Sequence, residues 1–258
     1  MDRTKEIIIK VIPSSVAVPF VKAHHYSGKV VQNSSLHFGC FLDGKLHGVL
    51  SYGPSMDKRK ILTLVRDTPW NGFLELNRMA FDDYLPRNSE SHCIAKTLRM
   101  IRRKAPHIKW IISFADGSQC GDGTIYRASN FLLTGIKENK SILHVPATGD
   151  NICQLLLSAH PDSPIAKKQS RALGVPHKYR TINEWLELGA EFIKGYQLRY
   201  IYFLDKHYRD KLTVPVLPYS EIDKRGAGMY KGQNIEREQR HEMKCEAQIK
   251  REEAKNAK

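Results

Sequence analysis

Alternating hydrophobic and polar positions predict short β-strands at the start of the chain. Residues 7–11 form a β-branched run, and residues 36–42 alternate between apolar and polar side chains. The Asp43-Gly44 pair that follows is typical of a hairpin turn, and it leads into a second apolar run over residues 46–50. We therefore expect an antiparallel hairpin in this part of the chain.

A helix is predicted between two strands in the middle of the chain. Residues 73–80 and 108–115 are strand-like, and Ile94, Leu98 and Ile101 recur between them at helical spacing. Because strand–helix–strand order favours a parallel pair of strands, we expect at least one such pair in the sheet.

The later segments predict fewer regular elements. We expect a helix that begins near Thr124 and ends at Gly135, with Ile125, Ala128, Ser129 and Leu132 buried. A strand is expected over residues 141–145, followed by a loop-rich stretch over 161–176. A helix over residues 181–193, with Trp185, Leu188 and Phe192 on one face, and a strand over 196–204 complete the expected elements. The expected fold class is α/β, with a mixed central sheet flanked by helices in a single domain over residues 1–220. Residues 221–258 are expected to form a charged helical or disordered tail.

The charge of the chain adds an expectation about its partner. There are 41 Lys and Arg residues against 27 Asp and Glu, a net charge of +14. Residues 221–258 hold ten basic and eight acidic residues, so +12 lies in residues 1–220. A basic body of this kind points to a polyanion, most simply nucleic acid.

Other features of the sequence bear on its location. No apolar run reaches the roughly 18 residues of a membrane span, and the first residues lack the pattern of a signal peptide. The five cysteines contain no Cys-x-x-Cys pair, so neither a disulfide framework nor a zinc knuckle is indicated. We expect a cytoplasmic protein that does not enter a membrane.

The strongest local feature joins a buried strand to a helix through a glycine-rich loop. The strand over 108–115 ends at Asp116, the loop spans residues 117–123, and Tyr126 follows in the first turn of the expected helix. Ligands in open α/β sheets bind at the carboxyl ends of strands. Asp116 and Tyr126, with Ser113 in the strand, are therefore candidate catalytic residues. The alternative is that Asp116 forms an Asx turn and Tyr126 packs in the core.

The entry to the helix over residues 90–104 is a candidate anion site. Arg87, Asn88, Ser89 and Ser91 precede or begin this helix. Their backbone N–H groups and the Arg87 charge suit a phosphate, but Asn and Ser are also ordinary helix caps.

Three polar residues interrupt the strand over residues 73–80. Strand alternation places Glu75 and Asn77 on one face and Arg78 on the other. Since buried polar groups need partners, this strand is expected to line a wet cleft. Exposure at a sheet edge, or an ion pair made by Arg78, is the competing interpretation.

A histidine pair followed by a tyrosine and a glycine turn occupies residues 24–28. His25 and Tyr26 could serve as a general base, a metal ligand or a stacking surface, whereas most such clusters are structural.

Taken together, these motifs resemble the Mom proteins of bacteriophage Mu and related prophages. The resemblance rests on residues 22–28, 74–79, 114–131, 199–206 and 215–219. It covers residues 20–220 and does not extend into the tail.

The resemblance implies a GNAT-like fold and conversion of adenine in DNA to N6-carbamoylmethyl (acetamido) adenine, which protects phage DNA from host restriction. It implies acyl-CoA (acetyl-CoA) as a possible cofactor, although residues 85–91 lack the usual glycine-rich turn. It also implies iron, for which His25, Tyr26, Asp116 and Tyr126 would be ligands only if the fold gathers them. The donor of the acetamido group is not indicated.

The leading hypothesis is therefore a DNA adenine-modifying transferase, encoded by a phage or prophage and acting on double-stranded DNA. An acyl-CoA-dependent N-acyltransferase on protein, RNA or a small amine, and a non-catalytic DNA-binding phage protein, are the alternatives. The catalytic candidates are Asp116, Tyr126, Arg78, His25, Tyr26 and Ser113. Candidate DNA contacts are Glu75, Asn77, Arg99, Arg102, Arg103, Lys167, Lys168 and Arg171.

Overall fold

A computed structural model describes residues 3–118, 121–157, 163–230, 233–234, 239 and 242. It divides the chain into two compact units, the first formed by Met1–Ile136 with Leu198–Lys258 and the second by Lys137–Gln197. The second unit is an insertion within the span that we expected to form a single domain.

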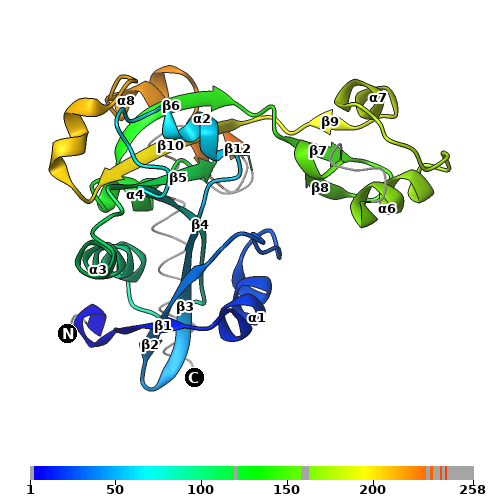
Figure 1. Cartoon of the computed structure of the whole chain (residues 1–258). Helices are drawn as coiled ribbons and strands as arrows, with labels where there is room; N and C mark the ends of the chain where they lie inside the picture. Colours follow the sequence, from blue (N-terminus) through cyan, green and yellow to red (C-terminus); the bar gives the residue numbers. More distant parts are fainter. Residues whose placement is uncertain are drawn as a thin grey trace. The chain divides into compact units, whose positions relative to one another are not determined.

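A seven-stranded mixed sheet forms the centre of the first unit (Figure 1). Its order is β1 (Ile8–Ile12), β2 (Leu36–Leu42), β3 (Lys45–Gly53), β4 (Phe73–Phe81), β5 (Trp110–Asp116), β10 (Tyr196–Phe203) and β6 (Leu132–Glu138). Strands β1 to β4 are antiparallel neighbours, and β4 and β5 are parallel. The predicted hairpin turn is confirmed, because Asp43 and Gly44 take positive φ angles of 49° and 76°.

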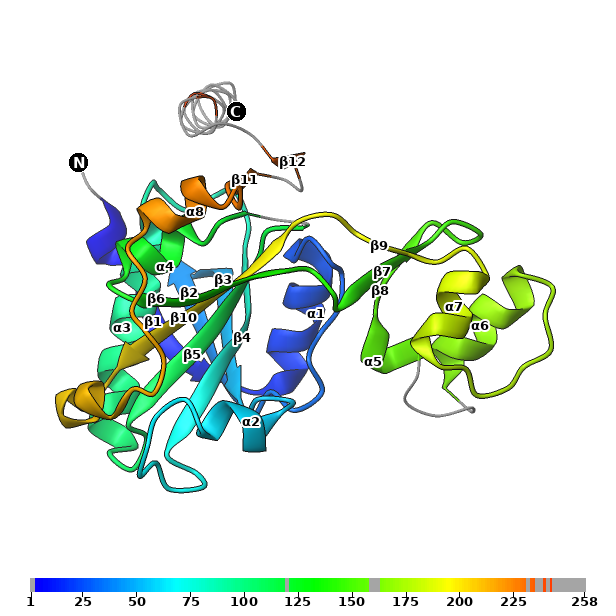
Figure 2. The same cartoon turned by 90° about the horizontal axis from the view of Figure 1, so that it is seen from above.

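Helices cover both faces of this sheet. The views in Figures 1 and 2 place α1 (Ser14–His24) and α3 (Ser89–Lys104) on opposite faces. Helix α3 buries the predicted Ile94, Leu98 and Ile101. Shorter elements of this unit are η1 (Arg3–Glu6), α2 (Lys58–Leu62), α4 (Thr124–Ala128) and η2 (Lys206–Lys211). The predicted mixed α/β sheet flanked by helices is confirmed.

The helix expected from Thr124 to Gly135 is wrong in its extent. Helix α4 ends at Ala128, which is exposed, and the chain turns through Asn130 at φ 62° into β6. The hydroxyl of Ser129 donates to the carbonyl oxygen of Ile125, which closes the last turn. The apolar residues that follow alternate along a strand rather than around a helix.

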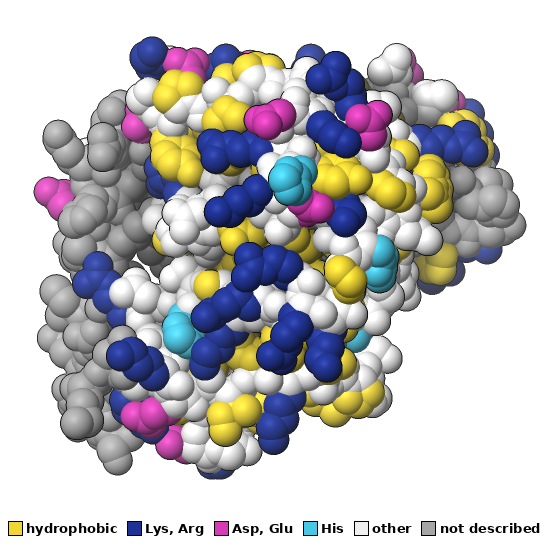
Figure 3. Space-filling model, turned by 60° about the vertical axis from the view of Figure 1, so that its left-hand side comes forward, with side chains coloured by type: hydrophobic (Ala, Val, Ile, Leu, Met, Phe, Trp, Pro, Cys, Tyr) yellow, Lys and Arg dark blue, Asp and Glu magenta, His cyan; other side chains and the backbone are white. Residues whose placement is uncertain are grey.

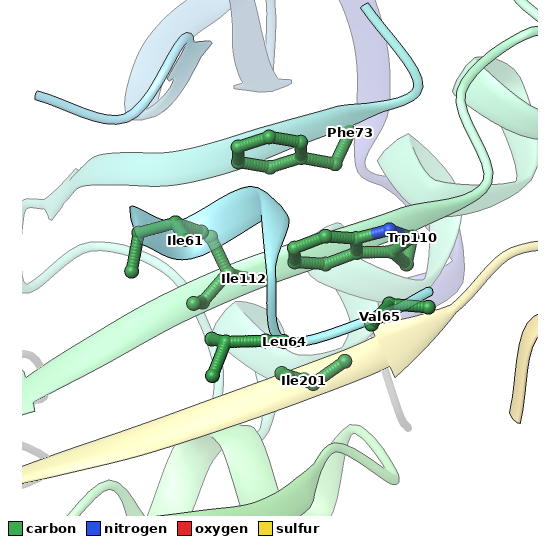
Figure 4. Close-up of a cluster of buried hydrophobic side chains, with 7 residues drawn as sticks. All are labelled: Ile61, Leu64, Val65, Phe73, Trp110, Ile112 and Ile201. Atoms are coloured by element: carbon green, nitrogen blue, oxygen red, sulfur yellow. The ribbon is translucent and has the colours of Figure 1, made fainter. Parts of the chain in front are cut away.

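A hydrophobic cluster fixes the point where β4 and β5 meet (Figure 4). The rings of Phe73 and Trp110 stack with centroids 4.4 Å apart, and the Trp110 indole N–H donates to the Thr68 hydroxyl. The other buried members of the cluster are Ile61, Leu64, Val65, Ile112 and Ile201. Burial of this much apolar surface anchors the start of both strands.

Beyond this cluster, β4 and β5 separate. Their pairing is limited to Phe73–Glu75 against Trp110–Ile112, after which β4 continues beside β3 and β5 beside β10. The buried hydroxyl of Ser113 donates to the carbonyl oxygen of Leu76 over 2.9 Å at the point of separation. We call this divergence the β4–β5 fork.

The second unit has its own sheet and core. Strands β8 (Asp150–Cys153), β7 (Ile142–Val145) and β9 (Glu191–Phe192) form its sheet, with α5 (Gln154–Leu157), α6 (Pro164–Ala172) and α7 (Ile182–Glu187). Its buried residues are Leu143, Val145, Ile152, Leu157, Ala166, Trp185 and Ala190.

Two expectations for the second unit are corrected. The stretch expected to be rich in loops contains α6. The helix expected over residues 181–193 ends early, because Gly189 takes a φ of 89° and Phe192 then lies in β9.

The predicted tail begins with ordered structure. Helix α8 (Ser220–Lys224) is followed by β11 (Met229–Tyr230) and β12 (Gln233–Asn234), and Ile222 and Ala227 are buried. Apart from these elements and single helical positions at residues 239 and 242, residues 231–258 lie outside the described residues, so the boundary at residue 220 stays a prediction. Within the described ranges, no helix combines the length and apolar character needed to cross a membrane.

Candidate active site

A β-bulge in β4 gathers the polar residues of this strand. Ser51 of β3 pairs with Arg78 and Tyr52 pairs with Leu76, which leaves Asn77 as the extra residue. The prediction that Arg78 faces away from Glu75 is therefore wrong. An extra residue shifts the alternation of a strand and redirects the next side chain, and the Arg78 charge acts on both Glu75 and His25.

Arg78 ties the segment after α1 to this bulge. Its Nε donates to the carbonyl oxygen of Lys29 over 3.1 Å, and its Nη1 donates to that of Asn77 over 2.8 Å. The guanidinium is thus fixed in position and is only half-buried at the residue level. It can supply a fixed positive charge to a bound anion or to a developing negative charge.

Glu75 is the carboxylate of this cluster. Burial raises its pKa, while a hydrogen bond with Ser55 and the Arg78 charge oppose that rise. A carboxylate whose pKa is raised is a stronger base than an ordinary carboxylate and is therefore suited to accept a proton.

His25 is held as a neutral hydrogen-bond donor. Its Nδ1 lies 3.1 Å from the backbone N of Ser27 and 2.8 Å from the Ser27 hydroxyl. Because the backbone N–H can only donate, Nδ1 is the acceptor and the ring proton is on Nε2. Burial, aided by the Arg78 charge, lowers the pKa of His25 to about 4. The role of general base is therefore less suited to His25 than the role of donor.

Tyr26 lies beside this histidine. The two ring centroids are 4.2 Å apart, and Tyr26 is 52% exposed. An exposed aromatic ring at the edge of a polar cluster can stack on an unpaired base.

Ser34 connects the same segment to the bulge. Its hydroxyl donates to Oδ1 of Asn77 over 2.8 Å. Neither Ser34 nor Ser27 was singled out from the sequence, since serines between a helix and a strand carry no distinctive pattern. The structure thus brings together Glu75, Asn77, Arg78, His25 and Tyr26, which we call the β4 cluster.

Asp116 and Tyr126 lie at the other side of the β4–β5 fork. Oδ1 of Asp116 accepts hydrogen bonds from the backbone N–H and the hydroxyl of Ser118, so the residue does form the Asx-type turn. Its pairing with Ser118 leaves the catalytic role of Asp116 a prediction. Residues 119 and 120 of the loop lie outside the described residues.

The loop returns to the end of β5 before α4 begins. A Cβ built on Gly123 would lie 3.0 Å from Cβ of Ala115 and 2.5 Å from the ring of Tyr200. The first turn of α4 is therefore next to the strand end that carries Asp116, as expected from the sequence.

Two other phenols, those of Tyr52 and Tyr200, are associated with Tyr126. Its ring centroid is 5.3 Å from that of Tyr200, and its charge state affects the pKa of Tyr52, whose hydroxyl bonds that of Thr97. Burial raises the pKa of Tyr52 and of Tyr200. Since those two are fully buried and Tyr126 is only half-buried, Tyr126 is the phenol of the three that a ligand can reach.

A cavity of about 720 Å³ opens at the start of α3. It is lined by Arg87, Asn88 and Ser91 from the predicted cofactor set and by Arg99 and Arg102 from the predicted DNA set. Asn88 takes a φ of 65°, and its side chain does not cap the helix. The two predicted sets thus share one basic cavity.

Ser89 is the exception in the predicted cofactor set. It is buried, its hydroxyl donates to the carbonyl oxygen of Pro86, and it does not line the cavity.

Basic side chains also cover the outer face of α3. Arg99, Arg102 and Arg103 are exposed, and Figure 3 shows Lys and Arg side chains gathered on the face that is turned forward there. A groove of about 850 Å³ beside β1 is lined by these three arginines together with Lys5 and Lys96.

The other basic group lies in the second unit. Lys167, Lys168 and Arg171 are exposed on α6, and Lys168 forms an ion pair of 2.6 Å with Asp150. Part of the Lys168 charge is therefore already neutralised.

Iron would need several side-chain ligands at one place. Within residues 3–118, 121–157 and 163–230 and the few described positions after them, no three His, Cys, Asp or Glu side chains cluster as metal ligands would. We derive no step through a metal.

Comparisons with known proteins cover most of the chain. The Mom protein family matches residues 6–221. Methylcarbamoylase mom of Escherichia phage Mu is 32% identical over 220 residues, which cover 84% of each chain.

Several acetyltransferases are among the solved structures with a related shape. One is an N-acetyltransferase from Staphylococcus aureus Mu50, with 9% identity, coverage of 77% of this chain and 99% of that chain, and a TM-score of 0.42. Another is an IAA acetyltransferase from Bacillus cereus ATCC 14579, with 10% identity, coverage of 76% of this chain and 99% of that chain, and a TM-score of 0.40. These likenesses are too distant to carry an argument about chemistry. The family match over most of the chain and the 32% identity together make this chain a member of the Mom protein family.

Proposed function

We propose that this protein transfers a carbamoylmethyl group to N6 of adenine in DNA, and that the modified DNA resists restriction enzymes. The observation that carries this proposal is the relationship to the phage Mu methylcarbamoylase, since the family match over residues 6–221 includes the β4 cluster, Asp116 and Tyr126. The basic body of the chain supports DNA as the substrate.

The reaction defines what the site must provide. A bond forms between N6 and the methylene carbon of the CH₂–CONH₂ unit, N6 loses one proton, and the donor's leaving group departs with the electron pair of its bond to carbon. The amine of adenine is a weak nucleophile, so a positioned proton acceptor lowers the barrier. Glu75 and Asp116 are the carboxylates that we assign to this task.

The remaining residues of the site are assigned by their chemistry. Tyr126 protonates the leaving group, because it is the accessible phenol at the fork. Arg78 stabilises developing negative charge. His25 donates through Nε2, and Tyr26 stacks on the base after it leaves the helix.

The cavity at the start of α3 suits a phosphate-bearing donor such as acyl-CoA. Arg87, Arg99 and Arg102 would pair with its phosphates, and Asn88 and Ser91 would orient them. Acyl-CoA supplies an activated carbonyl carbon, whereas the product requires a bond at a methylene carbon. We therefore assign the cavity to a phosphate-bearing ligand and do not assign the source of the transferred carbon.

DNA contact is assigned to the outer face of α3 and to α6. Arg103 and, in the second unit, Lys167 and Arg171 are exposed and suited to phosphate contacts that tolerate any sequence.

Restriction of plasmid DNA tests the proposed function. Plasmid from cells that express the protein is digested with endonucleases whose sites contain adenine, and plasmid from cells that express Y126F is the control. We expect the first to resist cleavage and the second to be cut. If both are cut while the purified protein consumes acyl-CoA with an amine, the protein is an ordinary N-acyltransferase. If both are cut and the protein only binds DNA, it is not an enzyme of this kind.

A further inference from the structure

Two asparagines near the β4 bulge each leave one half of the carboxamide without a partner. Asn77 is 7% exposed, its Oδ1 accepts from Ser34, and its Nδ2 is buried with no hydrogen-bond partner among the described residues. The Nδ2 of Asn33 donates to the carbonyl oxygen of Pro54, while its Oδ1 is likewise buried and unpartnered in the described part of the chain. Asn77 therefore has one spare donor and Asn33 one spare acceptor.

The chain places these two residues in the same region of the fold. Asn33 precedes Ser34, whose hydroxyl contacts Asn77 directly. A Cβ built on Gly53 would lie 2.3 Å from the backbone oxygen of Asn33, so residue 33 lies against the end of β3 with no side chain between them. Gly53 in turn pairs with Glu75 of β4. Residue 33 thus lies beside the end of β3 that pairs with Glu75 of the β4 cluster.

A buried donor and a buried acceptor that both lack a partner require an explanation. A buried donor or acceptor without a partner destabilises a fold, and native proteins contain few of them. Ordinary packing would let the spare Nδ2 of Asn77 and the spare Oδ1 of Asn33 satisfy each other. A ligand that presents a donor beside an acceptor satisfies both at once.

We infer that Asn33 and Asn77 read the hydrogen-bonding edge of an extruded adenine. Oδ1 of Asn33 accepts one N6–H, and Nδ2 of Asn77 donates to the neighbouring ring nitrogen. This inference rests on the proposed function, because it names the base that the β4 cluster receives. On its Watson–Crick edge adenine presents an amine donor next to the N1 acceptor, a pattern that cytosine shares, whereas guanine and thymine present a carbonyl oxygen next to a ring N–H. That oxygen would face Oδ1 of Asn33 and leave both groups unpaired.

The segment over residues 26–35 controls access to this edge. It contains no helix or strand, and it is held to β4 by the Arg78 bond to Lys29 and the Ser34 bond to Asn77. Because both spare atoms are closed to solvent, the base enters as this segment moves away from the bulge. The exposed ring of Tyr26 lies on the same segment and meets the face of the base.

A binding experiment without catalysis tests the inference. Duplex oligonucleotides carry, opposite an abasic site, either adenine or 1-deazaadenine, which has a C–H group in place of the ring nitrogen N1. The dissociation constants are measured by fluorescence anisotropy at one salt concentration. We expect the parent protein to bind the adenine duplex about tenfold more tightly than the 1-deazaadenine duplex. We expect N77D to lose this preference, because Asp presents no donor.

Controls separate base reading from charge and from folding. N71D introduces the same charge at an exposed position of the first unit and is expected to retain the preference. Equal binding of adenine and 1-deazaadenine by the parent would overturn the inference without any variant, and so would a folded N77D that keeps the preference. If the parent protein modifies plasmid but shows no preference for adenine, the inference is refuted and the proposed function stands. A preference without plasmid modification would refute only the proposed function.

Discussion

Acidification should weaken the fold through His25. The ring is largely buried and near the Arg78 guanidinium, which lowers its pKa from 6.5 to about 4. In the unfolded chain the same ring takes up a proton as the pH falls below about 6.5, whereas the folded protein does not. The contribution of the neutral His25 ring to the free energy of unfolding is therefore complete above pH 6.5 and is lost progressively as the pH falls to about 4.

The size of the effect follows from this difference in pKa. At about 1.36 kcal/mol for each unit, the full loss is at most about 3.4 kcal/mol. Because the ring is only partly shielded from water, we expect about 2 kcal/mol. The free energy of unfolding is measured by urea denaturation from pH 7.5 to pH 4.5 for the parent, H25Q and H107Q. His107 is exposed in the same unit and controls for the loss of one histidine.

We expect the stability of the parent to fall more steeply with acidification than that of H25Q, and H107Q to follow the parent. Parallel curves for the parent and H25Q would refute the assignment of a buried, neutral imidazole. So would an NMR titration in which His25 becomes protonated near pH 6.5.

Three further predictions concern the fork and the basic surface. G123A should destabilise the first unit by about 2–4 kcal/mol in thermal denaturation, because the added Cβ meets the Tyr200 ring at a positive φ. G44A is the control: it has a similar φ but open space around it, and its stability should fall by only about 1 kcal/mol. Y126F should lower the rate of DNA modification by at least about 100-fold with an unchanged melting temperature, and a fully active variant would remove this phenol from the mechanism. R103A should reduce the slope of log affinity for duplex DNA against log salt by about 0.9, and an unchanged slope would exclude a phosphate contact at this residue.

Local patterns in the sequence were sufficient for most elements of the first unit. The hairpin at Asp43, the helix α3 and the strand β5 each depend on a periodicity or a turn that a short window contains. The parallel pairing of β4 with β5 followed from their order in the chain.

Features that depend on pairing between distant segments could not be predicted in this way. The bulge at Asn77 arises from the register of β4 against β3, so strand alternation alone placed Arg78 on the wrong face. The division into two units has no signal in the sequence, because the core residues of the second unit are spread among polar ones and pack around Trp185. The partners of His25 and Asn77 are serines without a sequence signature.

The most direct test of the account is mass spectrometry of nucleosides from plasmid DNA that was propagated with the protein. The account predicts an adenosine nucleoside whose mass is increased by the carbamoylmethyl group in cells with the parent protein, and unmodified deoxyadenosine in cells with R78A or Y126F. Deoxyadenosine of unchanged mass with a folded, DNA-binding parent protein would contradict it.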